Sequence, residues 1–178
     1  NDTCYGKKDE SADMGKGVTL AYFVTFVKNT YTIANYKNRI FDLWDHGGAH
    51  LGYGPDTNTE KVMSLQEINF GLSKDPVKYD MVGFDACLMG NMETAKFIES
   101  RAKYLLASEE LEPGHGWNYT EIFNYIAKNP NTSIVDLGKF MVDSFTTSPA
   151  HSSTDGKTLA LADLSKIASV YSALDSLS

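Results

Sequence analysis

Short apolar runs alternate with segments of helical periodicity along most of the chain. Residues 39–44 are rich in β-branched and aromatic side chains, and residues 81–85 are almost continuously apolar, as expected of a strand buried on both faces. Residues 104–108 and 158–162 are two further candidate strands. The intervening segments predict helices over residues 18–31, 64–71, 91–103, 117–127, 133–145 and 163–177. Strands that alternate with helices predict an α/β fold, in which a parallel sheet is covered on both faces.

Reactive side chains follow two of these strands. His46 comes directly after residues 39–44, in a turn that contains Gly47 and Gly48, and Cys87 comes directly after residues 81–85. The carboxyl ends of parallel strands meet at one edge of a sheet, and sites in such folds lie there. We therefore expect the imidazole and the thiol to share that edge.

A cysteine beside a histidine is typical of nucleophilic catalysis. The thiolate attacks a carbonyl, and the imidazole takes or pairs with its proton. The backbone N–H groups of Cys87 and Gly47 are candidates for holding the oxyanion that then develops, and Gly47 also leaves room for a substrate beside His46. The alternative is that Cys87 is an inert core residue and His46 a structural one.

Acidic residues cluster near the predicted site. Asp85 precedes Cys87 by two positions, so the two side chains share a face of an extended strand end, and Glu109, Glu110 and Glu112 follow residues 104–108. A pocket lined by carboxylates selects a cationic Lys or Arg side chain. Two alternatives stay open, namely that residues 109–112 form a solvated loop and that Asp85 accepts turn amides.

Composition narrows the class of protein. The 178 residues predict one domain with a sizeable core, and the formal net charge of −7, without a basic stripe, argues against a nucleic-acid partner. No apolar stretch is long enough to span a membrane. The chain begins at Asn1, which we interpret as a processed or trimmed end.

The sequence favours neither a disulfide nor a metal site. Cys4 lies in a polar segment, so we expect Cys87 to remain a free thiol rather than pair with it. His46 and His50 are four residues apart, but the glycines between them predict a loop, and no third ligand cluster is evident. We expect no bound metal.

Three segments together resemble the clostripain family of cysteine peptidases, over a region from about residue 13 to about residue 164. These segments are Trp44-Asp45-His46-Gly47-Gly48, Gly83-Phe84-Asp85-Ala86-Cys87-Leu88-Met89 and Ala107-Ser108-Glu109-Glu110-Leu111-Glu112-Pro113-Gly114. The resemblance implies a caspase-like α/β/α sandwich with a mainly parallel sheet. It also implies that His46 is the base, Cys87 the nucleophile and Asp85 the residue that holds Arg or Lys in the S1 pocket.

The resemblance carries further expectations. The family opens with an additional strand and helix, so residues 1–178 are expected to form a single but partial peptidase domain, whose missing segment is a candidate separate chain. Relatives are activated by cleavage after a basic residue in the loop after the histidine. Lys61 is the only Lys or Arg between His46 and Lys74, which predicts self-processing at Lys61–Val62, with an uncut loop as the alternative. A secreted or cell-envelope bacterial location is expected. No cofactor is predicted, although some relatives need calcium, because no acidic cluster has the spacing of an EF-hand loop.

These observations predict an endopeptidase that cleaves peptides or proteins after Arg or Lys through a thioester on Cys87. The first alternative is a catalytically silent module of the same fold that binds basic peptides. A weaker one is a hydrolase that acts on another acyl substrate.

Overall fold

The structure is a computed structural model that describes residues 15–31, 36–56, 59–151 and 156–177. Four strands form one sheet in the order β1-β2-β3-β4. They are β1 (Ile40–Trp44), β2 (Tyr79–Asp85), β3 (Ala102–Ala107) and β4 (Ala160–Asp163). The first three run parallel, as the sequence predicts, and β4 runs antiparallel to β3.

The antiparallel β4 makes the sheet mainly rather than wholly parallel, as the resemblance implies. Two helices, α4 (Tyr119–Lys128) and α5 (Ile134–Thr147), separate β3 from β4. Because two successive helices return the chain to the edge that it left, β4 begins beside the carboxyl end of β3, where Ala107 pairs with Ala160. A single crossover helix would have produced a parallel pair.

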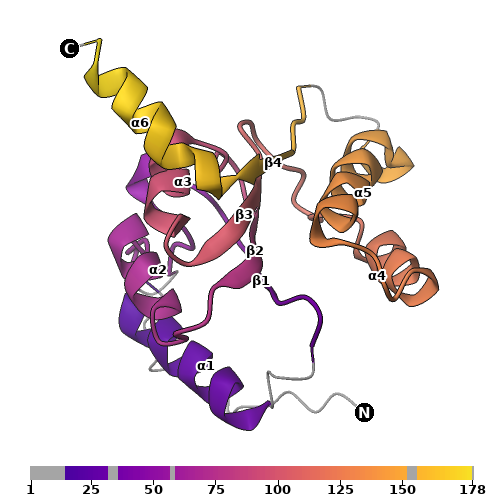
Figure 1. The fold of residues 1–178 in the computed structure, drawn as a ribbon, viewed down its shortest axis with the longest axis horizontal. Helices are drawn as coiled ribbons and strands as arrows, with labels where there is room; N and C mark the ends of the chain where they lie inside the picture. Colours follow the sequence, from indigo (N-terminus) through magenta and orange to yellow (C-terminus); the bar gives the residue numbers. More distant parts are fainter. Residues whose placement is uncertain (1–14, 32–35, 57–58, 152–155, 178) are drawn as a thin grey trace.

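Helices cover both faces of the sheet (Figure 1). On one side lie α1 (Gly17–Thr30), α2 (Leu65–Leu72), α3 (Met92–Ile98) and α6 (Ile167–Asp175), and on the other lie α4 and α5. Short 3-10 helices occupy η2 (Ala49–Leu51), η3 (Pro149–His151) and η4 (Leu164–Lys166), so the predicted last helix is divided between η4 and α6.

The alternation of side chains along β2 divides the core in two. Val82 and Phe84 pack with residues of α1, α2 and α3, whereas Met81 packs against α4 and α5. All three side chains are fully buried. This confirms the prediction that residues 81–85 form a strand buried on both faces.

The start of α2 follows its local sequence. The Ser64 hydroxyl accepts a hydrogen bond from the backbone N–H of Glu67, and the Glu67 carboxylate accepts one from the backbone N–H of Ser64. This capping box satisfies two amide groups that a helix start would otherwise leave unpaired.

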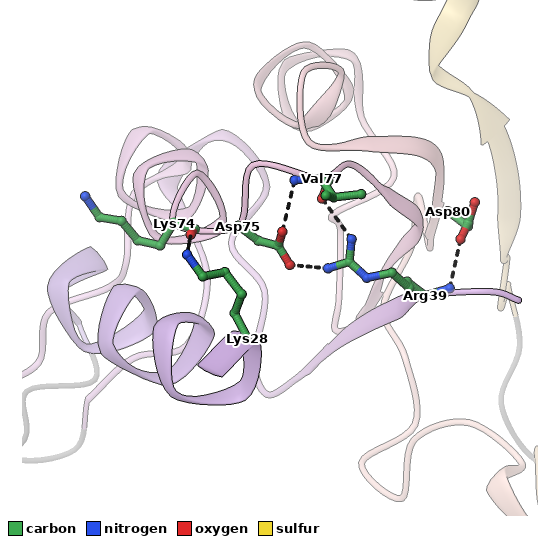
Figure 2. Close-up of polar contacts among 6 residues, drawn as sticks. All are labelled: Lys28, Arg39, Lys74, Asp75, Val77 and Asp80. Atoms are coloured by element: carbon green, nitrogen blue, oxygen red, sulfur yellow. Dashed lines mark hydrogen bonds and ion pairs between the residues drawn. The ribbon is translucent and has the colours of Figure 1, made fainter. Parts of the chain in front are cut away.

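A buried ion pair fixes the end of β1 that lies opposite the predicted site (Figure 2). Arg39 pairs with Asp75, and its guanidinium also donates to the carbonyl of Val77 at 3.1 Å. The backbone N–H of Arg39 donates to Asp80 at 2.8 Å. These contacts join the start of β1 to the turn before β2, so the two strands enter the sheet in a fixed register.

No helix within the described residues is long and apolar enough to cross a membrane.

Candidate active site

The register of β1 and β2 brings the histidine and cysteine turns together. Trp44 pairs with Asp85 at the last position of the ladder, and His46 and Cys87 each lie two residues further on. The N–H of Asp45 donates to the carbonyl of Asp85 at 3.3 Å, which continues the pairing into the turns. His46 and Cys87 line the same pocket, whose volume is about 460 Å³.

Gly47 lies at the contact between the two turns. A Cβ atom at this position would lie 1.9 Å from the carbonyl oxygen of Cys87, and 2.9 Å from the Met89 side chain. Any side chain larger than hydrogen would therefore separate the turns. Besides the substrate access and the oxyanion contact expected of Gly47, the structure shows a steric requirement inside the protein itself.

Cys87 is a partly exposed free thiol. Its Sγ accepts a hydrogen bond from the backbone N–H of Glu112 at 3.2 Å. The next residue, Leu88, has a φ of 64°, which is rare for a side chain of its kind, and its N–H donates to the carbonyl of Glu110. The turn that presents the sulfur is thus held by the loop after β3. Cys4 lies outside the described residues.

His46 is exposed at the rim of the pocket. Its backbone N–H donates to the carboxylate of Asp45 at 2.6 Å, and its carbonyl accepts from the N–H of Gly54 at 2.9 Å. The backbone of the histidine turn is therefore fixed, while the imidazole faces solvent or a ligand.

Two backbone donors in the histidine and cysteine turns are unused. Within the described part of the chain, the N–H groups of Gly47 and Cys87 have no hydrogen-bond acceptor. Free amides beside a nucleophile are the kind of group that stabilises an oxyanion.

Asp85 is buried at the wall of the pocket and fixes the loop after β3. Its Oδ2 accepts from the N–H of Trp117 at 2.9 Å and from the hydroxyl of Tyr119 at 2.7 Å. Gly116, with a φ of 70°, leaves room for this contact, because a Cβ there would lie 2.4 Å from Asp85 Oδ2. Asp85 thus lines the pocket, as predicted, and also accepts an amide, as the alternative proposed.

Glu112 is the second carboxyl group of the pocket. Its Oε2 accepts from the indole N–H of Trp117 at 3.1 Å. Burial, and then the hydrogen bond and the charge of Asp85, raise the pKa of Glu112 to about 10. A pKa of about 10 keeps the Glu112 carboxyl protonated at neutral pH.

Sequence reasoning missed two members of this acidic cluster. The Tyr119 hydroxyl lies 2.7 Å from Asp42 Oδ2 as well as from Asp85 Oδ2. Asp42 belongs to the exposed edge strand, yet loss of water around its carboxyl, together with the charge of Asp85, raises its pKa to about 6. The position of Asp42 inside an apolar run could have indicated a functional carboxylate. No local sequence pattern indicated that Tyr119 would contact it.

The other predicted acidic residues lie elsewhere. Glu109 and Glu110 are exposed and do not line the pocket that contains Cys87. Their backbones instead support the loop: the N–H of Glu109 donates to the hydroxyl of Thr158, and the carbonyl of Glu110 accepts from Ser108 and Leu88. Glu109 and Glu110 therefore belong to a solvated loop, as the alternative predicts, whereas Glu112 lines the pocket.

The predicted processing bond lies in an exposed loop. Lys61 and Val62 are both solvent-exposed and precede α2, and the carbonyl of Lys61 accepts from the N–H of Asp56. Glu60 has a φ of 55°, so the backbone before the bond is strained.

No group of three or more potential metal-ligating side chains occurs among the residues that the structure describes. His50 lies exposed in η2, apart from such a group.

A cysteine and a histidine that neighbouring parallel strands carry to one pocket, inside an α/β/α sandwich, define the fold class of caspase-like cysteine peptidases. The pattern of the clostripain family matches residues 2–178, and the chain belongs to that family. None of the curated proteins matches the chain.

Solved structures agree with this assignment at the level of the fold. A secreted cysteine protease from Bacteroides thetaiotaomicron, in complex with an irreversible peptide inhibitor, is 19% identical with a TM-score of 0.71, covering 89% of this chain and 48% of its own. An inactive zymogen protease from Parabacteroides distasonis is 19% identical with a TM-score of 0.71, covering 94% and 45%. A clostripain from Bacteroides thetaiotaomicron, in complex with the peptide inhibitor BTN-VLTK-AOMK, is 22% identical with a TM-score of 0.56, covering 67% and 51%. The chain thus spans about half the length of each.

Proposed function

We propose that this chain carries the catalytic centre of a cysteine endopeptidase that cleaves after Arg or Lys. The observation that carries the proposal is that Cys87 and His46 line one pocket together with the carboxyl groups of Asp85 and Glu112. A nucleophile, a base and an anionic wall are the parts that such a reaction needs.

The chemistry follows from the position of each group. The Cys87 thiolate attacks the scissile carbonyl, and the oxyanion accepts hydrogen bonds from the N–H groups of Gly47 and Cys87. The peptide C–N bond then breaks, and the leaving amine takes a proton from His46. Water, activated by the neutral imidazole, hydrolyses the thioester and regenerates the thiol. The backbone N–H of Glu112 donates to Sγ and so holds the sulfur in place in the pocket.

The substrate preference rests on charge. Asp85 and Glu112 lie in the same pocket as the sulfur, so a Lys or Arg side chain beside the scissile bond would meet two carboxyl groups. The peptide inhibitors bound to two of the related structures support a peptide substrate, and the inhibitor sequence VLTK ends in lysine.

A panel of fluorogenic peptides ending in Arg, Lys, Asp or Leu tests the proposal. We expect turnover only after Arg and Lys, and we expect Cys87→Ala to lower kcat/KM by about 10³-fold or more. Cys4→Ala, which removes the other thiol, serves as the matched control and should keep its activity. Because the reaction uses only side chains and backbone amides, activity should also survive EDTA, and a loss there would indicate a calcium requirement.

The same panel separates the alternatives. Cleavage after Leu or Asp would contradict the basic preference and favour a different acyl substrate. Basic peptides that bind without being cleaved, by the processed protein, would instead support a catalytically silent peptide-binding module.

We further propose that the chain is activated by its own cleavage at Lys61–Val62. The bond is exposed and follows a strained residue, and one related structure is an inactive zymogen. Lys61→Ala should remove the two fragments that the wild-type chain yields on a denaturing gel, while Lys74→Ala, the next lysine along, should not. Unchanged fragments in Lys61→Ala would exclude this bond.

The descriptions of two related proteins extend the proposal to location and activation. One of these proteins is described as secreted, and the other as an inactive zymogen. We propose that this protein is likewise exported and acts on peptides or proteins outside the cytoplasm.

A further inference from the structure

The two carboxyl oxygens of Glu112 have different surroundings. Oε2 accepts from the Trp117 indole, but Oε1 is buried, and no donor in the described part of the chain reaches it. The carboxyl of Asp85 is a close polar neighbour of the Glu112 carboxyl. Two ionised carboxylates in contact repel strongly, whereas one proton between them converts Glu112 into a donor. Oε1 of Glu112, which no hydrogen-bond donor among the described residues reaches, is therefore the atom that we expect to carry the proton.

The hydrogen-bond donors around Asp85 do not remove its repulsion with Glu112. Its Oδ2 already accepts from the Trp117 amide and from the Tyr119 hydroxyl. That hydroxyl has a single proton but lies 2.7 Å from both Asp85 and Asp42. One hydroxyl proton therefore serves two carboxylates, those of Asp42 and Asp85. Tyr119 has no further proton with which to relieve the repulsion between Asp85 and Glu112.

The titratable groups around the pair add negative charge. Asp42 faces it from β1, Tyr119 from α4, and Cys87 raises the pKa of Glu112 further. Tyr53, in the loop between η2 and α2, has its pKa raised by burial and then by the charges of Asp45, Asp42 and Asp85. His46 lies at the rim of the same pocket, and His115 belongs to the loop that precedes Trp117.

Building on the proposed basic specificity, we propose that the Asp85–Glu112 pair exchanges its shared proton for the cationic side chain of the substrate. In the empty pocket, Glu112 is a carboxylic acid that donates to Asp85. When an ammonium or guanidinium group enters, the O–H bond of Glu112 breaks, its proton passes to the solvent, and two carboxylates enclose the cation. Asp42 and Tyr119 are positioning residues that keep Asp85 in place. Selection of Arg or Lys is then coupled to pH.

Binding of agmatine, a guanidinium compound without a scissile bond, tests this exchange. We would measure the binding heat by titration calorimetry in phosphate and in Tris at the same pH. The difference between the two heats gives the number of protons released, and we expect about one per agmatine at pH 7.5. The affinity should rise about tenfold per pH unit between pH 5 and 8.

Variants identify the source of the proton. Glu112→Gln has no acid to ionise, so its proton release should fall to zero and its affinity should lose the pH slope. Glu121→Gln removes the same charge from the exposed surface of α4 and should behave as the wild type. If Glu112→Gln does not fold, the wild-type proton count decides alone.

The outcomes separate this inference from the proposed function. Agmatine binding without proton release, in a protein that cleaves Arg peptides, would overturn the exchange and leave the peptidase intact. Failure to bind agmatine and to cleave basic peptides would overturn both.

Discussion

At the scale of single residues, the site depends on groups whose size or charge leaves few alternatives. Gly47 allows the histidine turn to touch the cysteine turn, and Gly116 allows Asp85 to reach the loop after β3. Glu112 contributes twice, through its amide to the sulfur and through its carboxyl to Asp85. Small changes here should affect structure and activity together.

Gly47→Ala is the sharpest test at this scale. A methyl group 1.9 Å from the Cys87 carbonyl must push the turns apart, so we expect a loss of about 1–3 kcal/mol in the free energy of unfolding, measured by urea denaturation, together with a loss of activity. Gly114→Ala is the control, because nothing lies within 4 Å of its added methyl group, and its stability should change by less than about 0.5 kcal/mol. Equal stability of the two variants would contradict the contact.

At the scale of elements, the geometry of the site follows from how β1 and β2 are aligned. Five register pairs run from Ile40–Met81 to Trp44–Asp85, and the Arg39–Asp75 pair holds the opposite end of the same ladder (Figure 2). A shift of register by one residue would move His46 away from Cys87 and turn every side chain to the other face.

Asp75→Ala tests the anchor of β1. The Asp75 side chain is 2% exposed, and its removal leaves the largely buried Arg39 without a counter-charge, so we expect a destabilisation of about 3–5 kcal/mol. Glu99→Ala breaks the exposed Lys96–Glu99 pair and should cost less than about 1 kcal/mol. Thermal unfolding of both variants measures the difference, and equal melting temperatures would show that the anchor contributes little.

At the scale of the whole molecule, the acidic cluster couples stability to pH. The pKa values of Asp42 and Glu112 are raised, to about 6 and about 10, so the folded state binds these protons more tightly than the unfolded chain. Their contribution to stability is complete below pH 4 and is lost as the pH rises through about 6 for Asp42 and towards 10 for Glu112.

Unfolding measured at pH 5, 7 and 9 should therefore show that this part of the stability falls as the pH rises. Glu112→Gln should flatten the fall above pH 6, because it removes the carboxyl whose ionisation is opposed in the folded state. Glu121→Gln should leave the slope unchanged. A steeper fall in Glu112→Gln would contradict the assigned direction of the pKa.

That residues 1–178 form one partial domain, completed by a segment on another chain, stays a prediction. The chain spans about half the length of the related solved structures, and β1 forms one edge of the sheet among the described strands.

The sequence by itself determined whatever depends on short-range physics. Periodicity located the strands and helices, Ser64 and Glu67 marked the start of α2, and the rule that parallel strands end at one edge brought His46 and Cys87 to the same pocket. Only the tertiary structure decided which loop carboxyl groups line the pocket with His46 and Cys87. Glu112 turns inward while Glu109 and Glu110 do not, and Tyr119 meets Asp42 across 77 positions. The physical reason is that a loop's side chains point wherever distant elements leave room and donors, and no local pattern encodes that choice. The direction of β4 was decided in the same way, by the two helices that separate it from β3 along the chain and return the chain to the carboxyl end of β3.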